Sequence, residues 1–190
     1  MSYPLPMLIN HEREKLIEAV KFFAQNTRKL GKTKLFKLLY FLDFTHFKDT
    51  GRPVTGLEYF AWPMGPVPTD LFEELKRPER DWDGNCSFEF FSTAKGQMLR
   101  VEALSEFDPS HFSKRELRIM HSLADQFKNS DAEQMVEETH LENLPWHQIY
   151  EVQGRKQESI PYRMAVRRQE EGAVMSLATD RAELVGTLRK

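Results

Sequence analysis

A second cysteine is absent from the sequence, which excludes two kinds of stabilising site. Cys86 is the single cysteine among 190 residues, so one chain forms no internal disulfide and no metal cluster based on cysteine. No histidine lies near it in the sequence, and we interpret Cys86 as an inert thiol rather than a nucleophile. This cysteine usage fits a reducing compartment, and we expect a cytoplasmic protein.

Long hydrophobic runs are also absent. The amino terminus lacks a basic stretch followed by an uninterrupted apolar segment, as a signal peptide would have. The most apolar stretch, residues 34–47, is interrupted by Lys37 and Asp43 and is shorter than the roughly 20 residues that span a bilayer. We therefore expect no signal peptide, no membrane anchor and no membrane partner.

Motifs of the common enzyme classes are missing as well. The chain contains no G-x-S-x-G elbow, no P-loop, no G-x-G-x-x-G turn and no H-E-x-x-H zinc motif. Two groups offer side chains for a metal or acid–base site: His140 and His147 with Glu137 and Glu138, and Asp43 with His46. We favour capping or buried hydrogen-bonding roles for both groups, and we expect no enzyme, no metal and no cofactor.

The composition that is present is typical of a globular protein. Hydrophobic residues make up 40% of the chain, aromatic residues 12% and charged residues 29%. A chain of this length can bury one substantial core. We expect a single domain over residues 1–155 and a C-terminal extension over residues 156–190 that is either partly docked or mobile.

The stretch from Lys34 to Phe47 is predicted to be a central helix. Its apolar residues serve two helical faces: Leu35, Leu38, Leu39 and Leu42 on one, and Phe36, Tyr40, Phe44 and Phe47 on the other. A helix that is apolar on two faces must be buried on both. We expect it to begin at Thr33 and to end near Asp49, with Gly51 as a left-handed cap.

Further helices and a small sheet are expected around this helix. The predicted helices run from His11 to about Gln25 with Asn10 as cap, from a Ser113–Glu116 capping box to about Lys128, from Ala132 to His140 with Asp131 as cap, and from Leu144 to Tyr150. We also expect a short extended segment at residues 58–62, a short helix whose first turn holds Pro66 and Pro68, and an antiparallel hairpin formed by residues 88–92 and 98–103. Residues 160–162 are expected to dock, whereas the last fifteen residues form a short helix or stay mobile. The predicted class is α+β, mainly α: a compact helical domain around a buried central helix with a small antiparallel β-sheet.

Basic residues are concentrated where acids are missing. No acid occurs between Glu18 and Asp43, an interval that contains Lys21, Arg28, Lys29, Lys32, Lys34 and Lys37. This basic edge either faces an acidic partner, contacts phosphates or is simply a solvated helix end. The net charge of −2 argues against a protein dedicated to nucleic acid. Trp62, Met64 and Trp146 are either interface anchors or core residues.

Three short motifs carry a family resemblance. Gly51, Arg52 and Pro53 form a G-R-P turn after the central helix, and an A-W-x-x-G-P-V segment follows with Ala61, Trp62, Gly65, Pro66 and Val67. Further on, the segment SKRELRIMHSLADQF is followed by THLENLPWHQIY, which carries a T-H and P-W signature at His140, Pro145 and Trp146. Together these blocks resemble the Panacea domain, the family of SocA-like antitoxins and GepA-type phage-associated proteins.

The resemblance implies a mainly helical fold with a small sheet and a protein that binds and neutralises a cognate toxin. SocA-like members also act as adaptors that deliver the toxin to a ClpXP-type protease. We expect the partner-binding surface near Arg28, Lys29, Lys32 and Lys34, together with the exposed parts of Tyr59, Trp62 and Met64. The alternative is a nucleic-acid-binding regulator that uses the basic edge from Arg28 to Lys37.

Overall fold

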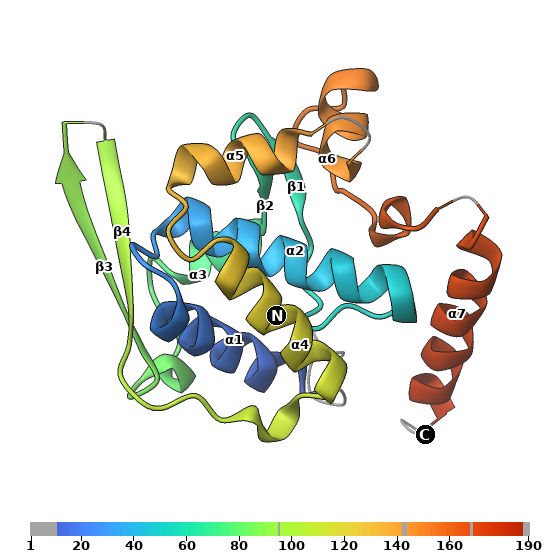
Figure 1. Cartoon of the computed structure of the whole chain (residues 1–190), viewed down its shortest axis with the longest axis horizontal. Coiled ribbons are helices and arrows are strands. Elements are labelled where there is room, and N and C mark those ends of the chain that lie inside the picture. Colours follow the sequence, from blue (N-terminus) through green and yellow to red (C-terminus); the bar gives the residue numbers. More distant parts are fainter. Residues whose placement is uncertain (1–10, 95, 142–143, 168, 188–190) are drawn as a thin grey trace.

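Helices dominate the fold, as Figure 1 shows for the computed structural model, which describes residues 11–94, 96–141, 144–167 and 169–187. The α-helices of this part of the chain are α1 (Glu12–Asn26), α2 (Lys32–Thr50), α3 (Thr69–Glu74), α4 (Lys114–Gln126), α5 (Ala132–His140), α6 (Pro145–His147) and α7 (Glu171–Thr187). The strands are β1 (Phe60–Trp62), β2 (Gly65–Val67), β3 (Cys86–Thr93) and β4 (Gly96–Ala103). Short 3-10 turns lie at η2 (Arg80–Trp82), η3 (Pro109–His111) and η5 (Tyr162–Ala165), and η4 (Gln148–Val152) is a π-helical turn. The predicted class, α+β and mainly α, is confirmed.

Helix α2 crosses the middle of the molecule and is buried on both predicted faces (Figure 1). Helices α1, α4 and α5, strand β2 and turn η5 all pack against it. Burial of each large apolar side chain stabilises the fold by roughly 1.5–3 kcal/mol, so this helix organises the core. Gly51 ends the helix with a left-handed φ of 67°, and its N–H donates to the carbonyl oxygen of Phe47. The predicted central helix and its glycine cap are therefore confirmed.

The loop after α2 is fixed by a buried carboxylate. Asp43 is fully buried and accepts hydrogen bonds from the N–H groups of Val54 and Thr55, the Thr55 hydroxyl and the Tyr59 hydroxyl, at 2.6–2.9 Å. Burial raises the pKa of Asp43 above its ordinary value, while these hydrogen bonds oppose that shift. The arrangement confirms a buried hydrogen-bonding role for Asp43. His46 is also buried, and its Nδ1 lies 2.7 Å from the carbonyl oxygen of Arg52.

The first hairpin differs from the prediction in its second half. Strands β1 and β2 are antiparallel, with Ala61 opposite Pro66 and Trp62 opposite Gly65. The extended segment is therefore confirmed, but Pro66 lies in a strand rather than in the first turn of a helix, and α3 begins at Thr69. The physical reason is the pairing of residues 60–62 with residues 65–67, which proline tolerates at the edge of a two-stranded sheet.

The second hairpin is longer than predicted and projects from the helical body (Figure 1). Strands β3 and β4 pair in register from Cys86 opposite Ala103 to Thr93 opposite Gly96. Leu99 and Val101 are buried against the body, while Phe91 and Met98 are exposed. The described residues thus contain two separate two-stranded sheets instead of one.

The predicted caps of α4 and α5 are present. The Ser113 hydroxyl accepts from the N–H of Glu116, and the Glu116 carboxylate accepts from the N–H of Ser113. Asp131 and Gln134 form the same reciprocal box at the start of α5. Such boxes satisfy amides that the first helical turn leaves unpaired. The predicted Asn10 cap of the first helix lies outside the described residues.

The chain after residue 155 contributes to the core. The N–H of Ile160 donates to the carbonyl oxygen of Tyr59 at 2.7 Å, and the Tyr162 hydroxyl lies 3.3 Å from Oδ2 of Asp43 and also donates to the carbonyl oxygen of Leu57. The predicted docking of residues 160–162 is therefore confirmed. Helix α7 packs against the end of α2, where Val174 joins Phe47 in a small apolar cluster. The division into residues 1–155 and 156–190 stays a prediction.

Within the described ranges, no helix combines the length and the apolar character that crossing a membrane requires.

Candidate partner-binding site

The structure disperses the basic edge that the sequence suggests. Arg28 and Lys29 are exposed in the loop between α1 and α2, and Lys32 is half-buried at the start of α2. Lys21 is buried and donates to the Glu18 carboxylate at 2.7 Å. Lys34 and Lys37 are also buried. The six cations therefore do not form a continuous surface.

Lys34 was expected on the partner-binding surface, and this placement is wrong. Its side chain is 1% exposed, and its Nζ donates to the carbonyl oxygens of Arg28, Lys128 and Ser130 at 2.9–3.2 Å. The reason is that two loops end close together, joined by a hydrogen bond from the N–H of Arg28 to the carbonyl oxygen of Lys128, and present carbonyl oxygens to the same point. An ammonium group with three donors satisfies all of them.

Tyr59 is likewise buried rather than exposed. It is 1% exposed, and its hydroxyl is committed to Asp43. Burial and the neighbouring Asp43 charge raise the pKa of the Tyr59 phenol well above its ordinary value. Tyr59 therefore belongs to the core.

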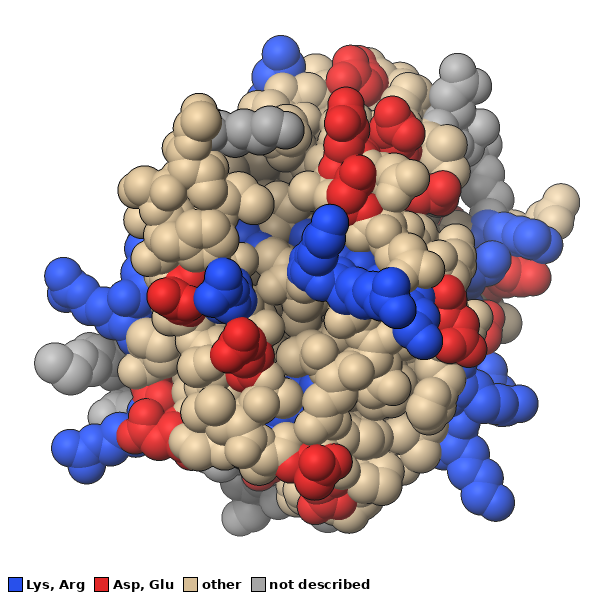
Figure 2. All heavy atoms as spheres, turned by 60° about the vertical axis from the view of Figure 1, so that its left-hand side comes forward, with Lys and Arg blue, Asp and Glu red and all other residues tan. Residues whose placement is uncertain are grey.

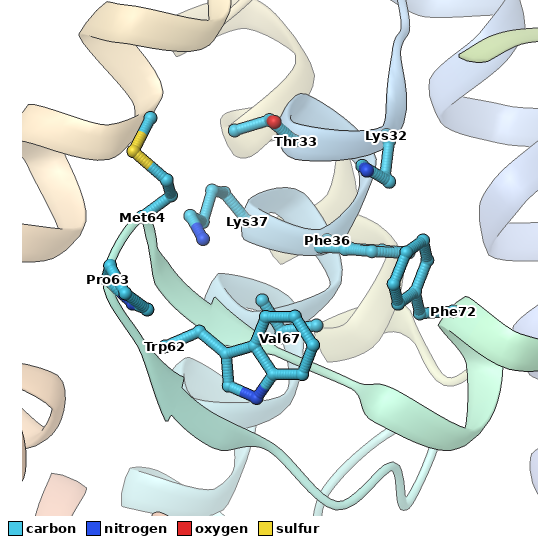
Figure 3. Close-up of a pocket in the computed structure, with 9 residues that line it drawn as sticks. All are labelled: Lys32, Thr33, Phe36, Lys37, Trp62, Pro63, Met64, Val67 and Phe72. Atoms are coloured by element: carbon cyan, nitrogen blue, oxygen red, sulfur yellow. The ribbon is translucent and has the colours of Figure 1, made fainter. Parts of the chain in front are cut away.

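Lys32, Trp62 and Met64 line one pocket, shown in Figure 3. Its volume is about 360 Å³, and its lining is completed by Thr33, Phe36, Lys37, Pro63, Val67 and Phe72. We name this space the Lys37 pocket. Met64, at the turn between β1 and β2, is 61% exposed at its rim. Phe72 contacts Phe36 and Trp62 edge-on, with ring centroids 6.0 and 6.2 Å apart, so the three rings form one continuous part of the wall.

Lys37 brings an amine into this apolar space. Its side chain is 1% exposed, and in Figure 3 its nitrogen points toward the turn that holds Pro63 and Met64. Among the described residues, its Nζ donates to one acceptor, the carbonyl oxygen of Pro66, at 2.8 Å. Burial lowers the pKa of Lys37 from 10.5 to about 7, because the apolar surroundings disfavour its charged form.

Two more cations lie at the Phe72 side of the pocket. Nζ of Lys32 is 4.6 Å and Nζ of Lys76 is 4.4 Å from the centre of the Phe72 ring. Lys76 pairs with Glu73 at 2.6 Å, whereas the described residues contain no acid within ion-pair distance of Lys32. Partial burial and the nearby Lys76 charge lower the pKa of Lys32. The pocket therefore combines an aromatic lining with positive charge.

Several of the motif residues contact the residues that line the Lys37 pocket. A Cβ on Gly65, which has a φ of 95°, would lie 2.7 Å from both Lys37 Nζ and Thr139 Oγ1, so only glycine fits here. The Trp146 indole donates to the carbonyl oxygen of Trp62 at 2.9 Å. His140 stacks on Trp146 with ring centroids 3.7 Å apart. These contacts place Trp146 in the core and tie α5 and α6 to the turn that carries Met64.

The remaining motif residues have structural roles. A Cβ on Gly51 would lie 2.7 Å from the carbonyl oxygen of Val174, and Arg52 lies 3.9 Å from the buried Glu116 carboxylate. Pro53 precedes the loop that binds Asp43. Ala61, Pro66, Val67 and Pro145 are buried. The G-R-P turn therefore joins α2 to α4 and α7.

The histidines do not assemble a metal site in the described part of the chain, where no group of three or more suitable ligands is found. His140 Nε2 and His147 Nδ1 are buried without a hydrogen-bond partner among the described residues. Burial and the nearby Lys37 charge lower the pKa of His140 below 6.5. His140 is thus a stacking residue next to the pocket.

Charge is mixed on the face that Figure 2 presents, where basic and acidic side chains lie on a largely uncharged surface and in several places touch one another. A long phosphate chain would meet both signs of charge on such a face. The arrangement is better suited to a protein partner with complementary groups of its own.

Sequence reasoning placed Trp62, Met64 and Lys32 at the partner-binding surface and counted Lys37 in the basic edge, but it did not predict the pocket or the parts that Phe36 and Phe72 play in it. A lysine inside a helix that is apolar on two faces was the available signal, because such a position must be buried. What the sequence does not give is the acceptor, Pro66, which lies 29 residues further on.

A comparison with protein-family models found one match, described as "Antitoxin SocA-like, Panacea domain", over residues 35–147. This segment is more than half of the 190 residues and includes most of the Lys37 pocket. The searches of curated proteins and of solved structures found no match.

Proposed function

Since the chain belongs to the SocA-like Panacea domain family, we propose that it is the antitoxin of a toxin–antitoxin pair and acts by binding its cognate toxin. The observation that carries this proposal is the Lys37 pocket, because the family-matched residues supply an open, aromatic-lined depression with an exposed methionine at its rim. Large apolar side chains in such positions concentrate binding energy. The role is a non-enzymatic one in the cytoplasm.

Neutralisation by binding needs a rigid scaffold and one complementary surface. The scaffold here is α2 with its surrounding helices, and Lys32 adds positive charge at the Lys37 pocket. Arg28 and Lys29, exposed in the loop before α2, remain candidates for further contacts with the partner. Two routes lead from binding to neutralisation: the antitoxin covers the toxin's active surface, or it delivers the toxin to a ClpXP-type protease. Both routes begin with the same complex.

Growth rescue tests this function. The protein is co-expressed with the product of the adjacent open reading frame, in cells with and without an active ClpXP-type protease. We expect the neighbour to be toxic alone and harmless together with this protein. Rescue that requires the protease indicates an adaptor, and rescue without it indicates direct inhibition. A toxic neighbour that is not rescued contradicts the proposal.

A pair of matched substitutions locates the surface. Met64→Glu places a charge at the rim of the Lys37 pocket, and Leu104→Glu makes the same change at a residue that is 57% exposed and does not line the pocket. We expect Met64→Glu to weaken toxin binding about tenfold or more, whereas Leu104→Glu binds like the wild type. Equal binding by both variants would place the interface elsewhere.

A further inference from the structure

The buried Lys37 amine has few groups around it that could balance a positive charge. Pro66 supplies one carbonyl acceptor, and an ammonium group has three donors. The described residues place no carboxylate within ion-pair distance of Lys37, in contrast to buried Lys15, which pairs with Glu116 at 2.6 Å. A buried charge without a partner is costly. The pocket is therefore prepared for a group that supplies the missing negative charge.

The walls of the pocket define the rest of such a group. Phe36, Trp62 and Phe72 form aromatic surfaces around a space of about 360 Å³, with Lys32 on one side and Met64 on the other. In Figure 3 the Lys37 nitrogen lies among these side chains rather than outside them. The space accommodates one large apolar side chain and a neighbouring anionic group, and it is too small for a folded element.

We propose that the Lys37 pocket receives an apolar side chain of the partner protein together with an adjacent carboxylate, which forms an ion pair with Lys37. The proposal rests on the proposed function, since it names the chemistry by which the toxin is recognised. Lys32 attracts the approaching acid, and the aromatic walls bind the apolar part. A neutral segment of the same shape leaves the amine without its counter-charge and binds more weakly.

The charge around the pocket favours a protein acid over a nucleic acid. Helix α3, which supplies Phe72, also carries the exposed acids Asp70 and Glu73. Glu73 pairs with Lys76, whereas the described residues place no cation within ion-pair distance of Asp70, so a chain of phosphates that ran along α3 would be repelled by Asp70. A single carboxylate placed at Lys37 avoids this repulsion.

The direct test uses two small probes of nearly the same shape, the anionic 3-phenylpropionate and the neutral 3-phenylpropanamide. Each is titrated into the full-length protein while the NMR signals of the Lys37 side chain and the Trp62 indole are followed. We expect the acid to shift both signals and to bind about tenfold more tightly than the amide, since hydrogen bonds to charged groups are the stronger ones. Equal affinities, or no shift with either probe, would overturn the proposal.

Substitutions distinguish the effect of Lys37 on binding of the acid from the effect of the protein's other positive charges. Lys37→Met is expected to remove the preference for the acid, whereas Lys128→Met, a change at an exposed residue of the loop between α4 and α5 that does not line the pocket, retains it. Lys32→Met, at the rim, is expected to reduce the preference only in part. If Lys37→Met does not fold, the ratio of the two affinities in the wild type still decides the question. Displacement of the acid by a single-stranded oligonucleotide would favour a phosphate ligand and contradict the proposal.

The result of the probe titration does not depend on the result of the growth assay. A preference for the acid without growth rescue would leave the pocket chemistry standing and reject the antitoxin role. Growth rescue without a preference for the acid would reject this inference and leave the role intact. When both hold, replacing acids of the toxin by their amides identifies the carboxylate that enters the pocket.

Discussion

Lys34 and Lys37 lie one turn apart on the same helix, and both are 1% exposed, yet their surroundings differ. Nζ of Lys34 donates to three carbonyl oxygens and joins the loop before α2 to the loop between α4 and α5. Nζ of Lys37 has one such acceptor among the described residues and lies against an open pocket. Depth of burial alone therefore does not say what a lysine does; the number of acceptors around its nitrogen does.

Lys34 and Lys37 therefore have different roles. The surroundings of Lys34 are complete and hold the fold together. Those of Lys37 are incomplete, and the free energy that its burial costs can be recovered when a partner supplies an acid. The expected effects of substitutions follow from this difference.

Lys34→Met should have the largest effect on stability. The substitution removes the Nζ donor from the part-buried carbonyl oxygens of Arg28 and Ser130 and the link between the two loops, and we expect the free energy of unfolding to fall by about 3 kcal/mol. Urea denaturation measures the loss, with Lys128→Met as the control for removal of an exposed charge. A loss below about 1 kcal/mol would mean that Lys34 is not structural.

The burial of Lys37 should instead change how the free energy of unfolding depends on pH. Its pKa is about 7 in the folded protein and 10.5 in an unfolded chain, so between these values the unfolded chain binds the extra proton. Stability then rises with pH, and we expect the wild type to gain about 2 kcal/mol relative to Lys37→Met between pH 7 and pH 9. Denaturation of both proteins at the two pH values measures it. Lys32 is common to both, so its titration largely cancels. The Lys37 charge lowers the pKa of His140, so the imidazole signals of both proteins are followed alongside. Parallel curves would contradict the expected pKa.

Gly65→Ala tests the back of the Lys37 pocket. The added methyl group would meet Lys37 and Thr139 at 2.7 Å in a backbone conformation with φ of 95°. We expect a loss of about 2 kcal/mol, compared with about 1 kcal/mol for Gly84→Ala, which has a φ of 73° but open space around it. Thermal or urea unfolding distinguishes them. Equal losses would show that backbone strain, not the contact with Lys37, decides the cost.

Met64→Glu should have the smallest effect on stability. Its side chain is 61% exposed, so we expect the free energy of unfolding to change by less than about 0.5 kcal/mol. Together with weakened toxin binding, an unchanged unfolding curve would assign this rim to recognition. A clear loss of stability would assign it to the fold.

The sequence predicted the parts of the fold that depend on local pattern. The two apolar faces of residues 34–47, the Ser113–Glu116 capping box and the hairpin of residues 88–103 are readable from spacing alone. The strand that contains Pro66 was missed, because its conformation is decided by pairing with residues 60–62. Lys34 was placed on the surface, because its acceptors at Lys128 and Ser130 lie 94 and 96 residues further along the chain.

The candidate site was predicted only in part for the same reason. Trp62 and Met64 were singled out as large side chains in a turn-rich segment, whereas Tyr59 was misplaced because Asp43 draws its hydroxyl inward. The pocket itself depends on how α2, the first hairpin and α3 meet, and no short sequence pattern encodes that.

The contact between Tyr162 and Asp43 has a consequence for synthesis of the protein. The ribosome synthesises Asp43 early, but Tyr162, whose hydroxyl lies beside the Asp43 carboxylate, follows 119 positions later. While the chain is still growing on the ribosome, the core around Asp43 stays incomplete until Tyr162 has emerged. Neither the helices nor the pocket can reach their final stability before then, so a nascent chain released early would be a poor binder and a ready substrate for proteases.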